Sequence, residues 1–201
     1  MQHKWFKSWF NSPYYHILYS GRNDEEAEFF MRNLIGYLKP GSGAKLLDIA
    51  CGKGRHAIFL RKMGFDVTGI DLSEQSINAA KKFEDEKLHF FVHDMRKLLY
   101  INYFDISFNL FTSFGYFETE KDNLNTLKAF AKGINHDGTL VIDYFNAYKV
   151  IRELKSSEIK EVKGIEFNIS KSLLKGKIIK NIDFQDNGIG YSFSEKVSAF
   201  T

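Results

Sequence analysis

The stretch Leu47-Asp48-Ile49-Ala50-Cys51-Gly52-Lys53-Gly54-Arg55-His56 decides how this chain of 201 residues folds. Its apolar first half predicts a short strand over residues 45–50, and the following residues predict a helix over 55–63. Between them, Gly52 and Gly54 predict a tight turn that lets a ligand approach the backbone closely. Free amides at the start of the helix attract negative charge. The stretch therefore predicts a ligand site at a strand–turn–helix junction.

Strands and helices go on alternating after this junction. We expect further strands at residues 65–70, 88–92, 104–111 and 139–145, the last of them after a turn at Asn135-His136-Asp137-Gly138. Ser73 and Thr119 are suited to cap the helices between strands. Strands separated by helices indicate βαβ units. The sequence therefore predicts an α/β fold, a doubly wound, mainly parallel sheet over residues 41–155.

The two flanks of this region differ from it. Residues 1–40 predict an aromatic-rich helical lid, and residues 156–201 predict an antiparallel β-meander. Within the meander, the Asn187-Gly188 turn indicates a hairpin. The hairpin sets Ile178, Ile182 and Phe184 opposite Ile189, Tyr191, Phe193 and Val197.

The last residues resemble an unfinished strand, so we expect a chain truncated before its closing strands. An uncovered sheet edge invites pairing, and a homodimer through the meander or that edge is expected.

Composition narrows the class of protein. Hydrophobic residues make up 44% and charged residues 26%, which excludes a disordered chain. The net charge of only +3 argues against a nucleic-acid partner. The single cysteine, Cys51, excludes an internal disulfide and a cysteine-cluster zinc site, and fits the cytoplasm. The sequence contains no run of about eighteen apolar residues, so it does not indicate a membrane span. No metal site is expected.

Acidic residues at the ends of successive strands indicate the ligand. Asp48 precedes the glycine turn, and a carboxylate there repels a pyrophosphate but suits an ammonium or sulfonium group. Asp71 ends the second strand and can accept both ribose hydroxyls. After the third strand, Asp94 can accept from an adenine amino group while Met95 packs on the ring. This set describes a pocket for a nucleoside with a cationic, amino-acid-like tail, such as S-adenosylmethionine.

The stretch Asp48-Ile49-Ala50-Cys51-Gly52-Lys53-Gly54 resembles motif I of the class I S-adenosylmethionine-dependent methyltransferases. Asp71, the pair Asp94-Met95, and the segment Asn109-Leu110-Phe111-Thr112-Ser113-Phe114-Gly115-Tyr116 are similar to that family's later motifs. Ala50 departs from the glycine that many members have. The resemblance covers roughly residues 25–150. It implies a Rossmann-like fold, methyl transfer, and S-adenosylmethionine as cofactor, held by Asp48, Ala50, Gly52, Gly54, Asp71, Leu72, Asp94, Met95 and Asn109.

The acceptor is narrowed by elimination. The sequence has no Asn/Asp-Pro-Pro-Tyr/Phe motif for methylating base amino groups and no Pro-Cys pair for a cysteine nucleophile. A small-molecule methyl acceptor remains. We expect Tyr14 and Tyr19 of the lid to touch the cofactor, and Phe114, Tyr116 and Tyr144 to line the acceptor side. No catalytic base is identified.

Two alternatives stay open. Gly52-Lys53-Gly54-Arg55-His56-Ala57 also satisfies the dinucleotide pattern G-x-G-x-x-A, which fits an NAD(P)-linked oxidoreductase. A non-catalytic module that binds a nucleoside is the other alternative.

Overall fold

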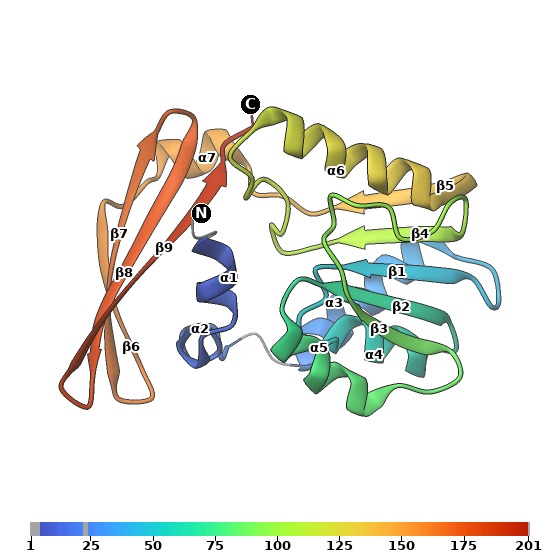
Figure 1. Ribbon diagram of the computed structural model, residues 1–201, viewed down its shortest axis with the longest axis horizontal. Coiled ribbons are helices and arrows are strands. Elements are labelled where there is room, and N and C mark those ends of the chain that lie inside the picture. The colour runs from blue at the N-terminus through green and yellow to red at the C-terminus, as the bar shows by residue number, and fades with distance from the viewer. Residues whose placement is uncertain (1–4, 22–23, 201) are drawn as a thin grey trace. The chain divides into compact units, whose positions relative to one another are not determined.

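The computed structural model describes residues 5–21 and 24–200 (Figure 1). Its contacts divide the chain into two compact units. The parallel-sheet unit comprises Gly21–Ser113 and Glu118–Tyr144, and the meander unit comprises Met1–Ser20, Phe114–Phe117 and Phe145–Thr201.

The parallel-sheet unit confirms the predicted Rossmann-like α/β fold. Its five strands pair in the order β3-β2-β1-β4-β5, and every pair is parallel. They are β1 (Lys45–Ile49), β2 (Asp66–Asp71), β3 (Leu88–Val92), β4 (Phe104–Asn109) and β5 (Ile134–Ile142). The strand order reverses between β1 and β4, and ligands of such sheets bind beyond the strand ends at this switch point.

Helices cover both faces of this sheet (Figure 1). They are α3 (Asp24–Leu38), α4 (Arg55–Lys62), α5 (Glu74–Ala80) with the short 3-10 turn η1 (Lys81–Phe83), and α6 (Glu120–Gly133). Ser73 and Thr119 cap α5 and α6 as expected. Alternate strand residues serve the two faces: Leu46 and Phe108 pack with α3 and α4, whereas Leu47 and Ile49 pack with Phe130 of α6.

The expected turn at residues 135–138 is wrong. These residues belong to β5, which begins at Ile134 and ends at Ile142 rather than running over 139–145. The pairing with β4 shifts register between Phe104 and Ile106, and Asp137 adopts a left-handed φ of 66°. A bulge therefore absorbs the turn-forming residues without ending the strand. Gly138 is required there, because a Cβ atom would collide with the Ile134 side chain.

The meander unit contains the predicted antiparallel sheet. Its strands β6 (Ser157–Val162), β7 (Ile165–Leu174), β8 (Lys177–Asp186) and β9 (Ile189–Ser198) pair in chain order. Ile178 pairs with Val197, Ile182 with Phe193 and Phe184 with Tyr191, which confirms the hairpin register. Helices α1 (Trp5–Phe10), α2 (Pro13–Leu18) and α7 (Ala147–Arg152) complete this unit.

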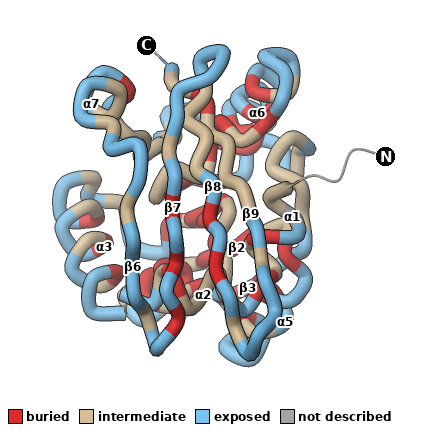
Figure 2. Tube along the Cα trace, turned by 90° about the vertical axis from the view of Figure 1, so that its left-hand side faces the viewer, coloured by how far each residue is buried: buried red, intermediate tan, exposed pale blue. Residues whose placement is uncertain are grey.

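One face of the meander is buried. Buried positions alternate along β7 and β8 (Figure 2) and include Phe167 and Ile182, both fully buried. Trp9 of α1 and Leu18 of α2 join the same apolar cluster. Helices α1 and α2 thus supply part of the meander's core, whereas Met31 and Ile35 of α3 belong to the core of the parallel-sheet unit. The predicted division of the chain into domains at 1–40, 41–155 and 156–201 stays a prediction. The structure does not describe residues 1–4, 22–23 and 201, which fall within these ranges.

Among the described residues, no helix has the length and hydropathy needed to cross a membrane.

The close packing of β2 against β3 predicts a stability effect. A Cβ atom on Gly69 would lie 2.5 Å from the Phe90 ring and 3.0 Å from the Cys51 sulfur, whereas one on Gly36 in α3 meets nothing within 4 Å. We expect Gly69→Ala to lower the free energy of unfolding by about 1–3 kcal/mol through overpacking. The control Gly36→Ala should raise it by up to about 1 kcal/mol, since alanine favours a helix. Urea denaturation followed by circular dichroism measures both, and equal effects would contradict the packing argument.

Candidate active site

The turn after β1 is built from left-handed residues. Ala50, Gly52 and Gly54 have φ values of 61°, 57° and 83°. The turn is fixed by the Cys51 N–H, which donates to the Ile70 carbonyl at 2.9 Å, and by the Gly54 N–H, which donates to the Cys51 carbonyl at 3.0 Å. Ala50 therefore holds a conformation that costs an alanine about 1–2 kcal/mol and a glycine little. This conformational cost is a physical reason for the glycine that many proteins with a similar motif have at this position.

Glycine serves two purposes in this turn. A Cβ atom on Gly54 would lie 2.6 Å from the Phe90 ring, so the side chain must be absent for the turn to pack. At Gly52 a Cβ atom would meet nothing within 4 Å. The backbone at Gly52 is thus open on the side where a side chain would stand, and a ligand can approach it there.

Asp71, the last residue of β2, is bonded directly to this turn. The Gly52 N–H donates to its Oδ2 at 2.9 Å, and the Ser73 N–H donates to its Oδ1 at 2.7 Å. Burial raises the pKa of the Asp71 carboxyl, and these two amides together with that of Leu72 oppose the rise. The structure therefore brings the acid of the second strand to the glycine turn of the first.

Asp48 lies close to Asp71 and is almost fully buried, with 2% of its surface exposed. Burial, and then the Asp71 charge, raise the pKa of Asp48 to about 7, against opposing effects of the Ala57 backbone N–H and the Arg55 charge. The Oδ2 atom of Asp48 has no hydrogen-bond partner among the described residues. Two neighbouring carboxylates, a half-buried one and a buried one with an unsatisfied oxygen, fit a ligand that brings positive charge and hydrogen-bond donors.

The loop after β4 touches the turn on both of its flanks. Asn109 is fully buried, and its Nδ2 donates to the carbonyl of Ile49 at 3.2 Å. The ring of Phe111 stacks on His56 in the first turn of α4, with ring centroids 5.1 Å apart and planes 7° from parallel. Burial lowers the pKa of His56 to about 3, so its imidazole is neutral at physiological pH. Phe111 and His56 both stand in stretches quoted from the sequence, but no spacing rule predicts their contact, because it depends on the sheet order.

Asp94 and Met95, which follow β3, have different surroundings. Arg96 holds the Asp94 carboxylate through its guanidinium, with the shortest contact at 2.6 Å, and also reaches Asp122 at 3.3 Å. Met95 packs with Ile49 and Ile70 on the face that α6 covers.

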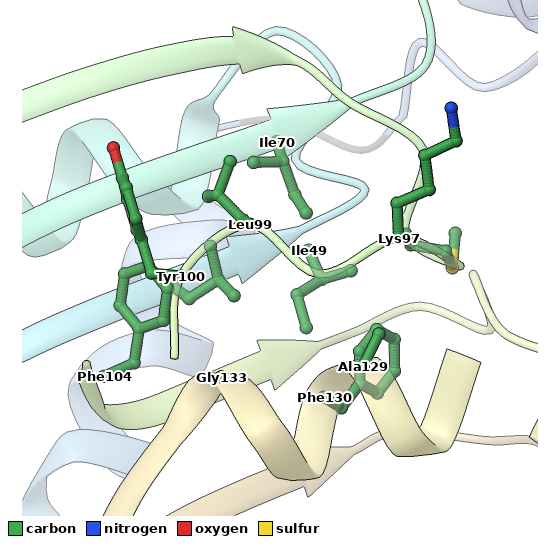
Figure 3. Close-up of a pocket in the computed structure, with 11 residues that line it drawn as sticks. Ile49, Ile70, Lys97, Leu99, Tyr100, Phe104, Ala129, Phe130 and Gly133 are labelled. Atoms are coloured by element: carbon green, nitrogen blue, oxygen red, sulfur yellow. The ribbon is translucent and has the colours of Figure 1, made fainter. Parts of the chain in front are cut away.

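That face holds a small cavity of about 20 Å³ between the sheet and α6 (Figure 3). Its lining is mainly apolar and includes Leu99, Phe104 and Phe130 (Figure 3). The cavity is about the size of one water molecule, so it is a packing gap and does not accommodate a nucleoside.

The tyrosines and phenylalanine expected near the ligand lie in both units. Tyr144 is in the parallel-sheet unit, and burial raises its pKa. In the meander unit, the Tyr14 hydroxyl donates to Asp186 at 2.9 Å and the Tyr19 hydroxyl to Glu195 at 2.7 Å. The Tyr116 ring lies 5.3 Å from Trp5, and Phe114 stacks on Phe200. The structure thus gives Tyr14, Tyr19, Phe114 and Tyr116 contacts within the meander unit. The contacts of all five residues with cofactor or acceptor stay predictions.

Residues 40–188 match the family model described as a methyltransferase domain, which is most of the chain. The chain belongs to the class I S-adenosylmethionine-dependent methyltransferase family.

A glycine/sarcosine N-methyltransferase from Aphanothece halophytica is 32% identical over 144 residues, 68% of this chain and 52% of that protein. A dTDP-3-amino-3,4,6-trideoxy-alpha-D-glucopyranose N,N-dimethyltransferase from Streptomyces venezuelae is 31% identical over 132 residues, 64% of this chain and 54% of that protein. The chain spans about half the length of the curated relatives it matches.

Solved structures show the same fold. A methyltransferase from Clostridium acetobutylicum superposes with a TM-score of 0.75 at 18% identity, over 94% of this chain and 79% of that one. The sugar N-methyltransferase KedS8 from a Streptoalloteichus species also gives 0.75, at 20% identity over 93% of this chain and 78% of that one.

The raised pKa of Asp48 predicts a pH-dependent stability. The folded protein keeps a proton on Asp48 up to about pH 7, whereas the unfolded chain releases it near pH 3.9. The stability that this proton contributes is complete below about pH 4 and is lost as the pH rises to about 7. We expect Asp48→Asn to remove that loss, which is roughly 1.4 kcal/mol per pH unit between pH 5 and 7.

Urea unfolding at pH 5, 6, 7 and 8 measures this effect. The control Asp66→Asn, at the half-buried start of β2, should keep the wild-type slope. Parallel profiles for wild type and Asp48→Asn would contradict the prediction.

Proposed function

We propose that this chain is the catalytic domain of an enzyme that moves the methyl group of S-adenosylmethionine to the nitrogen of a small-molecule amine. The observation that carries the proposal is the arrangement of the buried Asp48 and the half-buried Asp71 around the open Gly52 turn, near the ends of two paired strands. The relatives named above as N-methyltransferases of glycine, sarcosine and an amino sugar support the choice of an amine.

Each group of the cofactor has a matching residue in this proposal. Asp48 takes the positively charged amino group of the cofactor through its unsatisfied oxygen. Asp71 accepts the ribose hydroxyls, since each of its oxygens keeps a second lone pair beyond the backbone amide it already accepts. Asp94, Met95 and Leu72 border the adenine, and Asn109 and Ala50 border the methionine portion.

The chain's own contribution to methyl transfer is alignment. The cofactor supplies a methyl group that is already activated by the sulfonium charge. The protein therefore has to fix the acceptor nitrogen in line with the methyl and to exclude water. In this proposal Phe114, Tyr116 and Tyr144 line the acceptor side, where aromatic faces favour a methylammonium product. The amine has to reach the methyl group in its neutral form, with its lone pair free.

The two other classes of function fit the site less well. An NAD(P)-linked oxidoreductase would place a pyrophosphate beside Asp48 and Asp71, and these two neighbouring acidic side chains disfavour a second anionic group. A non-catalytic nucleoside-binding module would use the same pocket and is separated from an enzyme only by product detection. A homodimer and a cytoplasmic location remain part of the proposal.

Ligand selectivity tests the proposed cofactor. Isothermal titration calorimetry should show binding of S-adenosylmethionine and S-adenosylhomocysteine and none of NADH. We expect Asp71→Asn to weaken S-adenosylhomocysteine binding by about tenfold, as for loss of one charge-assisted hydrogen bond. The control Asp183→Asn, at an exposed position of β8, should bind as the wild type does. Binding of NADH in preference to S-adenosylhomocysteine would reject the proposal.

Incubation with S-adenosylmethionine and glycine, sarcosine or an amino sugar, followed by mass spectrometry, tests methyl transfer.

The lid role of residues 1–20 has its own test. Deleting them should weaken S-adenosylhomocysteine binding by about tenfold if Tyr14 or Tyr19 contacts the cofactor. Trp9 and Leu18 are buried against the meander, so the deletion also exposes apolar surface. The double variant Tyr14→Phe/Tyr19→Phe keeps both rings and removes only the hydroxyls. Full affinity in both proteins, with the circular dichroism spectrum retained, would remove the lid from the proposal.

A further inference from the structure

The loop that follows β4 has a backbone that its own sequence disfavours. Phe111 and Thr112 are consecutive and both left-handed, with φ values of 56° and 57°. A bulky aromatic residue and a β-branched residue rarely adopt this region. Surrounding contacts must therefore hold the loop in this conformation.

Asp143, the residue directly after β5, makes those contacts. Its carboxylate accepts the Phe111 N–H at 2.8 Å, and its carbonyl accepts the Thr112 N–H at 3.2 Å. Its own N–H donates to the carbonyl of Asn109 at 2.9 Å. One residue thus fixes three backbone positions of the loop.

The same loop also contacts the residues on both sides of the glycine turn. Asn109 holds the carbonyl of Ile49, the residue just before the turn. Phe111 stacks on His56, just after the turn, and also lies under the Arg55 guanidinium at 4.9 Å. The path from Asp143 to the turn therefore consists of direct contacts, all within the parallel-sheet unit.

We propose that Asp143 is a positioning residue for the cofactor site: it holds the loop of residues 109–113, and that loop holds the glycine turn at Ile49 and His56. Asp143 acts through its hydrogen bonds and does not itself touch the cofactor. The inference rests on the proposed function for the identity of the ligand.

The experiment compares full-length variants with S-adenosylhomocysteine as the probe. Asp143→Ala removes the acceptor of the Phe111 N–H, whereas Asp143→Asn keeps one carboxamide oxygen in its place. Asp137→Asn is the matched control, since it makes the same change on β5 at a side chain that is 89% exposed. Calorimetry gives the dissociation constant, and amide hydrogen exchange reports on Phe111 and Thr112.

We expect Asp143→Ala to raise the dissociation constant by about tenfold and to speed exchange at Phe111 and Thr112. Exchange in β1 and β2 and the melting temperature should stay close to wild type. Asp143→Asn should bind within about twofold of wild type, and Asp137→Asn should match it.

Three results would overturn the inference. One is an unchanged dissociation constant in Asp143→Ala. A second is faster exchange throughout the sheet with a lower melting temperature, which marks a merely structural role. The third is an Asp143→Asn variant that binds S-adenosylhomocysteine as weakly as Asp143→Ala does.

If Asp143→Ala does not fold, Asp143→Ser takes its place, because the serine hydroxyl is too short to replace the carboxylate. A wild-type protein that binds no S-adenosylhomocysteine refutes the proposed function instead, and the exchange at Phe111 and Thr112 still decides whether Asp143 holds the loop.

Discussion

The hydrogen bond from the Gly52 N–H to the Asp71 carboxylate is the contact on which the candidate site depends. It joins the end of β2 to the turn after β1 and thereby brings a second acid close to the buried Asp48. Two neighbouring carboxylates, one buried and one half-buried, cannot both be charged at low cost. One of them must keep a proton or meet a cation. The raised pKa of Asp48 expresses this constraint. In the proposed function, the same constraint favours a positively charged ligand at this place.

Local rules of sequence account for much of the fold. The β8–β9 register follows from the Asn187-Gly188 turn and a period of two, because both act between near neighbours. The meeting of Asp48 and Asp71 also follows, since parallel strands end at a common edge. The bulge in β5 does not follow: pairing with β4 overrides the turn preference of Asn135-His136-Asp137-Gly138, and that pairing joins residues about thirty positions apart. The packing of α1 and α2 on the meander escapes local rules for the same reason.

Part of the left-handed, non-glycine backbone of the parallel-sheet unit lies at the site, and the rest lies at Lys39, Asn102 and Asp137. Ala50 in the turn, and Phe111 and Thr112 in the loop, are left-handed without being glycine. Ala50 needs no special partner, because its neighbours Cys51 and Gly54 already fix the turn. Phe111 and Thr112 depend on Asp143, a residue that no motif marks. The site is thus predictable where a residue type is needed for chemistry, and unpredictable where a residue supplies only geometry.

The electrostatics of the candidate site also limit where the proton of Asp48 can go. When a cationic group approaches, it favours the charged form of Asp48, because opposite charge lowers a carboxyl pKa. Asp71 cannot take the proton as easily, since the amides of Gly52 and Ser73 already stabilise its charged form. The neutral His56 lies in the first turn of α4, but burial and the nearby Arg55 oppose its protonation. If the cofactor's amino group binds Asp48 as proposed, the proton therefore leaves for solvent near neutral pH. The proposed binding mode thus couples ligand binding to proton release through one buried side chain.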